Sequence, residues 1–72
     1  MRPEQLYDVV AVGLPPRQPV VRLMATGKTR GNAEAFVRMA FYRRKVDDEF
    51  FAGVPAGMYQ EGDVWRGDGS HD

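Results

Sequence analysis

Five acidic side chains in the second half of the chain are of a type that suits metal binding. Residues 47–49 read Asp-Asp-Glu, and Glu61 and Asp63 follow them. Carboxylate oxygens are the ligands that hard cations prefer. However, the spacing matches no cation-binding loop, and adjacent residues of a strand point to opposite faces. We therefore predict no metal site, and we expect these acids to form a turn or to pair with Arg43 and Arg44.

The tripeptide Gly27-Lys28-Thr29 resembles the end of a phosphate-binding loop. That motif also requires a glycine at the position that Arg22 occupies here. Without a glycine-rich stretch, nothing is predicted to surround a phosphate with backbone amides. The tripeptide is instead typical of a turn that leads into a helix cap, so we predict no nucleotide or other cofactor site.

The chain has few residues that suit nucleophilic or acid–base catalysis. There is no cysteine, and the one histidine, His71, stands next to the C-terminal residue. No pair of acids has a sequence context that predicts a shifted pKa, which a general acid or base requires. We therefore predict no catalytic residues and a protein that is not an enzyme.

Basic residues gather at the two ends of the predicted helix. Lys28 and Arg30 precede it, and residues 43–45 (Arg-Arg-Lys) end it, about 20 Å away. Residues 1–46 carry nine basic and three acidic side chains, hence plus six, and residues 47–72 carry one and seven, hence minus six. Either the fold interleaves the two halves, or the surface has one positive and one negative region and favours a charged partner. Nucleic-acid binding through the basic helix ends is our alternative functional hypothesis.

Three segments have the β-branched and aromatic content of strands, namely 7–12, 20–25 and 50–54. The proline-rich loop 13–19 makes the first two a hairpin. With the helix before the third strand, the prediction is an α+β fold, a small ββαβ domain. It has a three-stranded antiparallel sheet in the order 2-1-3, with one helix packed on one face. We expect residues 1–65 to form a single domain and 66–72 a disordered C-terminal tail.

The helix is predicted over residues 32–46, with Thr29 or Asn32 as its N-cap. Its apolar arc is wider than one sheet covers. The side that carries Ala33, Phe36, Val37 and Ala40 should pack on the sheet. The side that carries Met39, Tyr42 and Val46 should lie against a partner or under the C-terminal segment around Trp65.

The face of the sheet opposite the helix is also expected to be apolar and in need of cover. It would carry Val10, Val12, Val20 and Met24, or their opposites in the alternation, with little in the chain to cover them. A chain of 72 residues buries only about 60% of its unfolded surface, and association is a usual remedy. We therefore predict a protein-binding module that forms a homodimer or docks on another protein. The candidate partner-binding residues are Met39, Tyr42, Arg43, Arg44, Val46, Tyr59 and Trp65.

No segment has the run of about 18 apolar residues that a membrane span needs, and the N-terminus lacks the apolar part of a secretory signal. We therefore expect a cytoplasmic protein without a membrane partner.

Several runs resemble small accessory proteins of bacteriophages and prophages. They are residues 7–12 (Tyr-Asp-Val-Val-Ala-Val), 32–35 with 43–44, 46–51 (Val-Asp-Asp-Glu-Phe-Phe) and 62–65 (Gly-Asp-Val-Trp). The resemblance carries no binding residues over to this chain. It implies an inhibitor that binds a host or anti-phage defence complex, in the manner of anti-CRISPR proteins.

Overall fold

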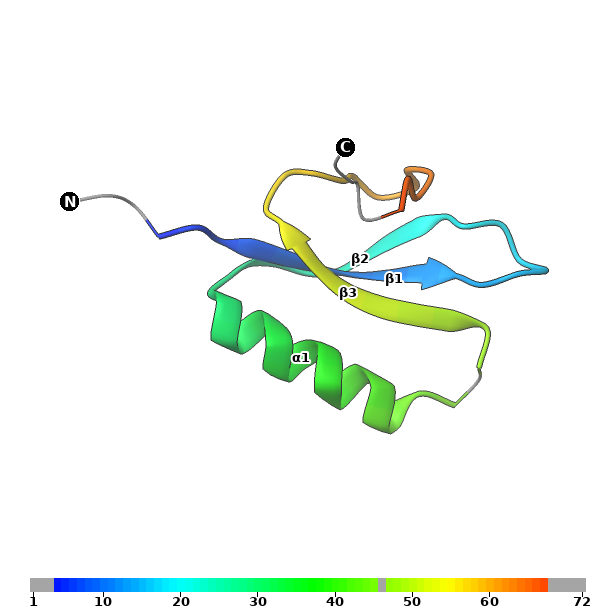
Figure 1. Cartoon of the computed structure of the whole chain (residues 1–72), viewed down its shortest axis with the longest axis horizontal. Coiled ribbons are helices and arrows are strands. Elements are labelled where there is room, and N and C mark those ends of the chain that lie inside the picture. Colours follow the sequence, from blue (N-terminus) through cyan, green and yellow to red (C-terminus); the bar gives the residue numbers. More distant parts are fainter. Residues whose placement is uncertain (1–3, 46, 68–72) are drawn as a thin grey trace.

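The computed structural model describes residues 4–45 and 47–67. The elements are β1 (Tyr7–Gly13), β2 (Val21–Lys28), α1 (Arg30–Arg43) and β3 (Glu49–Pro55). The strands form one antiparallel sheet in the order β2-β1-β3, and α1 lies on one face of it (Figure 1). The predicted α+β fold and strand order are thus confirmed. Residues 68–72 of the predicted tail lie outside the described residues.

The helix begins two residues before its predicted start and ends earlier than predicted. Thr29 is extended, and its hydroxyl oxygen accepts a hydrogen bond from the amide of Asn32 at 3.3 Å. Thr29, not Asn32, is therefore the N-cap. The helix ends at Arg43 because Arg44 is already extended, with φ −64° and ψ 146°. The predicted last helical residue, Val46, lies outside the described residues.

Two irregularities interrupt the pairing of β2 with β1. Val9 lies opposite Ala25 and Val10 opposite Leu23, so β2 has one residue more than β1 at this point, and the same happens again before Lys28. An extra residue of this kind is a β-bulge, and it reverses the alternation of side chains beyond it. Ala25 therefore lies on the face of Val9, whereas Leu23 lies on the face of Val10.

Asp8 is a buried acid that ties the second bulge to the turn after β3. The residue is 5% exposed. One carboxylate oxygen accepts from the amide of Gly27 at 3.1 Å, and the other accepts from the amide of Gly57 at 3.0 Å. Both glycines have positive φ, at 66° and 83°, a conformation that other residues rarely adopt. Asp8 thereby holds in place the β2 end from which α1 starts.

The segment 56–67 covers the face of the sheet opposite α1 (Figure 1). The core on that side joins Val10, Val12, Val21, Val54 and Tyr59, with Trp65 packed against them. The Trp65 ring stacks on the Tyr59 ring, with 5.1 Å between the ring centres. It packs edge-on against the Phe50 ring, with 5.4 Å between the ring centres.

Backbone contacts draw this segment back to the sheet. Val64 pairs with Val20, and the amide of Trp65 donates to the carbonyl of Pro19 at 2.7 Å. The prediction that the chain has little to cover this face is therefore wrong, because the turns after β3 return Tyr59 and Trp65 to it.

Candidate functional site

The inner side of α1 packs as the sequence predicts. Ala33 is buried, and Phe36, Val37 and Ala40 are half-buried. The helix lies mainly over β3 and β1 and touches β2 least. Because it is placed to one side, a groove of about 420 Å³ remains between α1 and β2.

The groove has an apolar floor. Met24 comes from β2, Phe51 from β3, and Phe36, Met39 and Ala40 from α1. Met39 is 50% exposed, although it belongs to the apolar arc of the helix. Methionine side chains are flexible and polarisable, so a floor with two of them adapts to ligands of different shape. This floor is the part of the α1 surface that suits a partner's apolar side chains.

Basic residues form the rim of the groove, together with Glu49. They are Arg22, Arg43, Arg44 and Lys45. Arg22 pairs with Glu49 at 3.1 Å, and Arg44 pairs with Asp47 at 3.3 Å. Among residues 4–45 and 47–67, Arg43 and Lys45 have no carboxylate within 4 Å. The rim therefore carries two cations that the described part of the chain does not neutralise.

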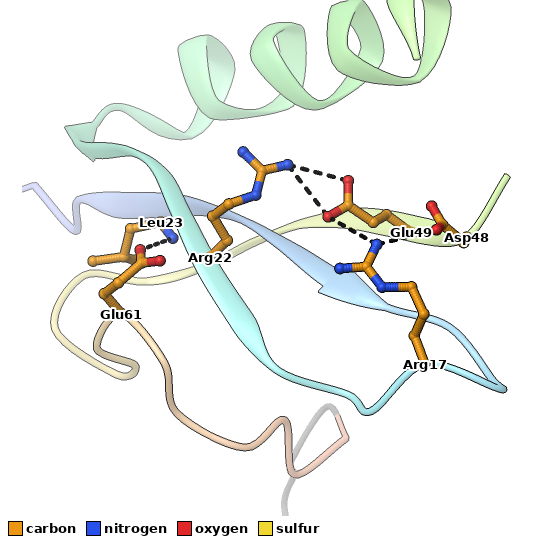
Figure 2. A network of polar contacts seen from close by, with 6 residues as sticks. All are labelled: Arg17, Arg22, Leu23, Asp48, Glu49 and Glu61. Carbon is orange, nitrogen blue, oxygen red and sulfur yellow. Dashed lines mark hydrogen bonds and ion pairs between the residues drawn. The ribbon is translucent and has the colours of Figure 1, made fainter. Parts of the chain in front are cut away.

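The acids that were considered as metal ligands form ion pairs and hydrogen bonds within the sheet and its turns. Figure 2 shows Glu49 between Arg22 and Arg17, with Asp48 contacting Arg17 at 3.2 Å. Glu61 accepts a hydrogen bond from the amide of Leu23, and Asp63 accepts one from the amide of Gln60.

The predicted ion-pair partners were partly right. Arg44 does pair with Asp47, but Arg17 and Arg22 take the place that was expected for Arg43. Acids of the second half thus pair with bases of the first, so the fold interleaves the two charged halves at this end of the sheet. Within the described ranges, no set of acids and histidines converges on a metal-sized site.

The candidate partner-binding residues separate into two groups. Met39, Arg43 and Arg44 meet at the groove, and Tyr42 stands on the solvent side of α1 with 93% of its surface exposed. Val46 lies outside the described residues. Tyr59 and Trp65 lie across the sheet from these residues, under no part of α1.

Tyr59, a predicted partner-binding residue, is buried, with 3% of its surface exposed. Its hydroxyl group donates to the carbonyl of Gly67 at 3.2 Å and accepts from the amide of Arg66 at 3.3 Å. The Arg66 guanidinium carbon lies 4.6 Å from the centre of the Tyr59 ring. Tyr59 therefore anchors the C-terminal segment, and Trp65, which is half-buried beside it, is part of the same core.

The sequence did not identify Arg22, Met24, Phe36 and Phe51 as parts of the site. Arg22 and Met24 are two residues apart in the predicted strand 20–25, so alternation places them on one face, which was a usable signal. That this face opens beside the helix depends on where α1 lies across the sheet, and periodicity says nothing about that.

The helix of the described region is too short and too highly charged to cross a bilayer. Comparison of the chain with known protein families, with curated proteins and with solved structures found no match.

Proposed function

We propose that this chain is a non-catalytic protein-binding module, and that its partner places an acidic segment with apolar side chains in the groove between α1 and β2. The observation that carries the proposal is the apolar floor around Met39 beside two unneutralised cations, Arg43 and Lys45. No described part of the chain fills this groove, whereas the opposite face of the sheet is covered by residues 56–67.

The two kinds of side chain set the chemistry of the partner. Burying the exposed part of Met39 and the groove-facing atoms of Met24 and Phe36 favours Leu, Phe or Met in the partner, at about 25 cal/mol per Å² of apolar surface. Arg43 and Lys45 favour Asp or Glu at the edge of that segment and disfavour basic partners. An amphipathic acidic helix or an extended acidic peptide meets both requirements.

The resemblance to phage and prophage accessory proteins suggests which partners to test first. Host proteins and components of anti-phage defence complexes that carry such a segment are the partners we propose. Binding there would inhibit by occlusion, which requires no catalytic residue in this chain.

A peptide library displayed on phage or yeast and selected against the purified protein tests the groove. We expect enrichment of sequences that combine Asp or Glu with large apolar residues. Met39→Glu should abolish their binding, because it places a carboxylate in the apolar floor and repels the acidic ligand. Arg43→Glu should weaken binding, most strongly at low salt.

Met58→Glu is the matched control. Met58 is 44% exposed, close to the value for Met39, but it lies in the turn after β3 and not in the groove. It should leave peptide binding unchanged. Equal loss in both variants, or enrichment of basic peptides, would contradict the proposal.

Nucleic-acid binding is the second candidate, and one observation favours it. Arg38, Arg43 and Lys45 lie exposed along α1 or just after it, and none has an ion-pair partner among the described residues. The positive charge along α1 is smaller than the sequence indicates, because Arg30 pairs with Glu34 and Arg44 pairs with Asp47.

A duplex oligonucleotide distinguishes the two functions. A nucleic-acid binder would retain the duplex at low salt, lose it steeply as salt rises, and keep it in Met39→Glu better than in Arg43→Glu. The protein-binding proposal predicts no retention of the duplex at the salt concentration at which acidic peptides bind.

A further inference from the structure

The sheet has two edges, and residues 61–63 of the described chain bond to one of them, at the Val21 end of β2. Along β2, the amide of Val21 donates to the carbonyl of Asp63 at 2.8 Å, and the amide of Gly62 donates to the carbonyl of Val21 at 2.9 Å. The amide of Leu23 donates to the Glu61 carboxylate at 2.8 Å (Figure 2). Three of the four outward backbone groups of Val21 and Leu23 are therefore bonded within the chain.

The edge formed by β3 differs. The carbonyl of Asp48, just before β3, accepts from the amide of Leu14, and the amide of Ala56, just after β3, donates to the carbonyl of Leu6. The even-numbered residues of this segment therefore direct their backbone groups toward β1. The register is uninterrupted between them, with Ala52 opposite Val10. Hydrogen-bonding direction alternates along a strand, so Glu49, Phe51 and Gly53 direct their amides and carbonyls away from β1.

Nothing in the described part of the chain accepts or donates to these outward groups of β3. In Figure 1, α1 lies on one side of the sheet and residues 56–67 lie on the other, and β3 passes in front of β1 as an outer strand. Proteins usually protect such an edge, because its unpaired amides and carbonyls form a template for another strand.

We propose that the β3 edge binds the β3 edge of a second copy of this chain, antiparallel, so that two three-stranded sheets join into one continuous sheet. Each outward residue of an antiparallel edge presents one donor and one acceptor, so the edge is complementary to itself under a two-fold axis. This surface is distinct from the groove, and the inference does not depend on the proposed function.

Pro55 determines the register of this contact. It has an outward position in the same alternation but no amide hydrogen, so the usable groups are those of Glu49, Phe51 and Gly53. The backbone groups of all three residues are used only when the two-fold axis passes midway between the two copies of Phe51. Each Glu49 then lies opposite the partner's Gly53, about six hydrogen bonds form, and no like charges are opposed.

The same axis brings the two helices together. Paired β3 strands lie about 4.8 Å apart, and because α1 lies over β3 and β1, the two helices come within packing distance, ~10 Å. The α1 side toward this edge carries the exposed Phe41, whose ring contacts Phe51 at 5.0 Å. It also carries Arg38 and, beside Gly53, the ion pair of Arg30 with Glu34, so charges of both signs, with positive charge in excess, face the second copy.

Gly53→Pro tests the contact without altering the pairing of β3 with β1. It removes an amide hydrogen that no described residue of the chain accepts, and a Cβ at this position meets only the Cβ of Ala33, at 3.7 Å. Proline is accepted at such edge positions. We expect wild-type protein to sediment with twice the mass of one chain at micromolar concentration, and Gly53→Pro to sediment as one chain with an unchanged circular dichroism spectrum.

Gly31→Pro is the matched control. Gly31 lies in the first turn of α1, where the amide is outside the helical ladder and nothing stands within 4 Å of an added Cβ. This variant should remain a dimer. A wild-type protein that stays a single chain at millimolar concentration, or a Gly53→Pro variant that stays a dimer, overturns the proposal.

Hydrogen exchange of wild-type amides decides the question even if Gly53→Pro fails to fold. The amides of Phe50, Ala52 and Val54 face β1 and should exchange slowly at every concentration. The amides of Phe51 and Gly53 should slow as protein concentration rises. Fast exchange of these two at every concentration contradicts the contact.

Discussion

Asp8 offers the sharpest test of how the β2–α1 connection is held. Asp8→Asn keeps the size of the side chain but replaces one carboxylate oxygen by an amide group. Both oxygens of Asp8 accept from backbone amides, those of Gly27 and Gly57. In the variant, one of these buried amides faces an NH₂ group and loses its acceptor.

The magnitude follows from burial. Leaving a buried donor without a partner costs about 1–3 kcal/mol, and Asp8 is 5% exposed, so water does not replace the lost acceptor. The free energy of unfolding should fall by that amount, and Tm by about 4–8 °C per kcal/mol for a domain of this size. Asp8→Ala removes both acceptors and should cost about twice as much.

Urea unfolding at a fixed protein concentration, followed by the fluorescence of Trp65, measures the loss. Asp63→Asn is the control: within residues 4–45 and 47–67, only one carboxylate oxygen of Asp63 accepts, from the amide of Gln60 at 2.8 Å, so the asparagine keeps that bond. It should change the free energy of unfolding by less than about 0.5 kcal/mol. Equal effects of Asp8→Asn and Asp63→Asn would refute the role assigned to Asp8.

Three further substitutions test the packing, the cap and the C-terminal anchor, each with urea unfolding as the measurement. Gly13→Ala should destabilise by about 1–3 kcal/mol, because a Cβ there would stand 2.4 Å from the carbonyl oxygen of Gln18; Gly31→Ala, with open space around it, should stabilise instead. Thr29→Ala removes the N-cap and should cost about 0.5–2 kcal/mol with a loss of helical circular dichroism, whereas a helix of unchanged content and stability would contradict the cap. Tyr59→Phe keeps the stacked ring but removes a hydroxyl with two hydrogen bonds, so we expect a loss of about 0.5–1.5 kcal/mol; the same change at the exposed Tyr42 should have no measurable effect.

The architecture was predictable from local signals. Alternating β-branched residues, a proline-rich loop and one glycine-poor apolar run predicted the strands, the hairpin and the helix, and chain connectivity then predicted the sheet order. The bulges in β2 were not predictable in the same way. They depend on Asp8 and Gly27, which are far apart in the sequence and meet only in the folded sheet.

The candidate site was predicted in part. Met39 was assigned to partner binding because the apolar arc of the helix exceeds what one sheet covers. It does border the groove, as do the predicted Arg43 and Arg44. Tyr59 and Trp65 were named as candidates for partner binding, but residue type alone does not distinguish a surface aromatic from one that closes a core. Their burial results from the turns at residues 56–63, which return the chain to the open face of the sheet.

Mapping the bound peptide on the protein tests the central claim most directly. A selected acidic peptide is titrated into isotope-labelled protein, and the changes in amide chemical shift are followed by residue. Binding in the groove predicts the largest changes at Met24, Phe36, Met39 and Arg43, with residues 59–65 unaffected. Changes that gather instead around Tyr59 and Trp65, or along β3 alone, would contradict the assignment of partner binding to the groove between α1 and β2.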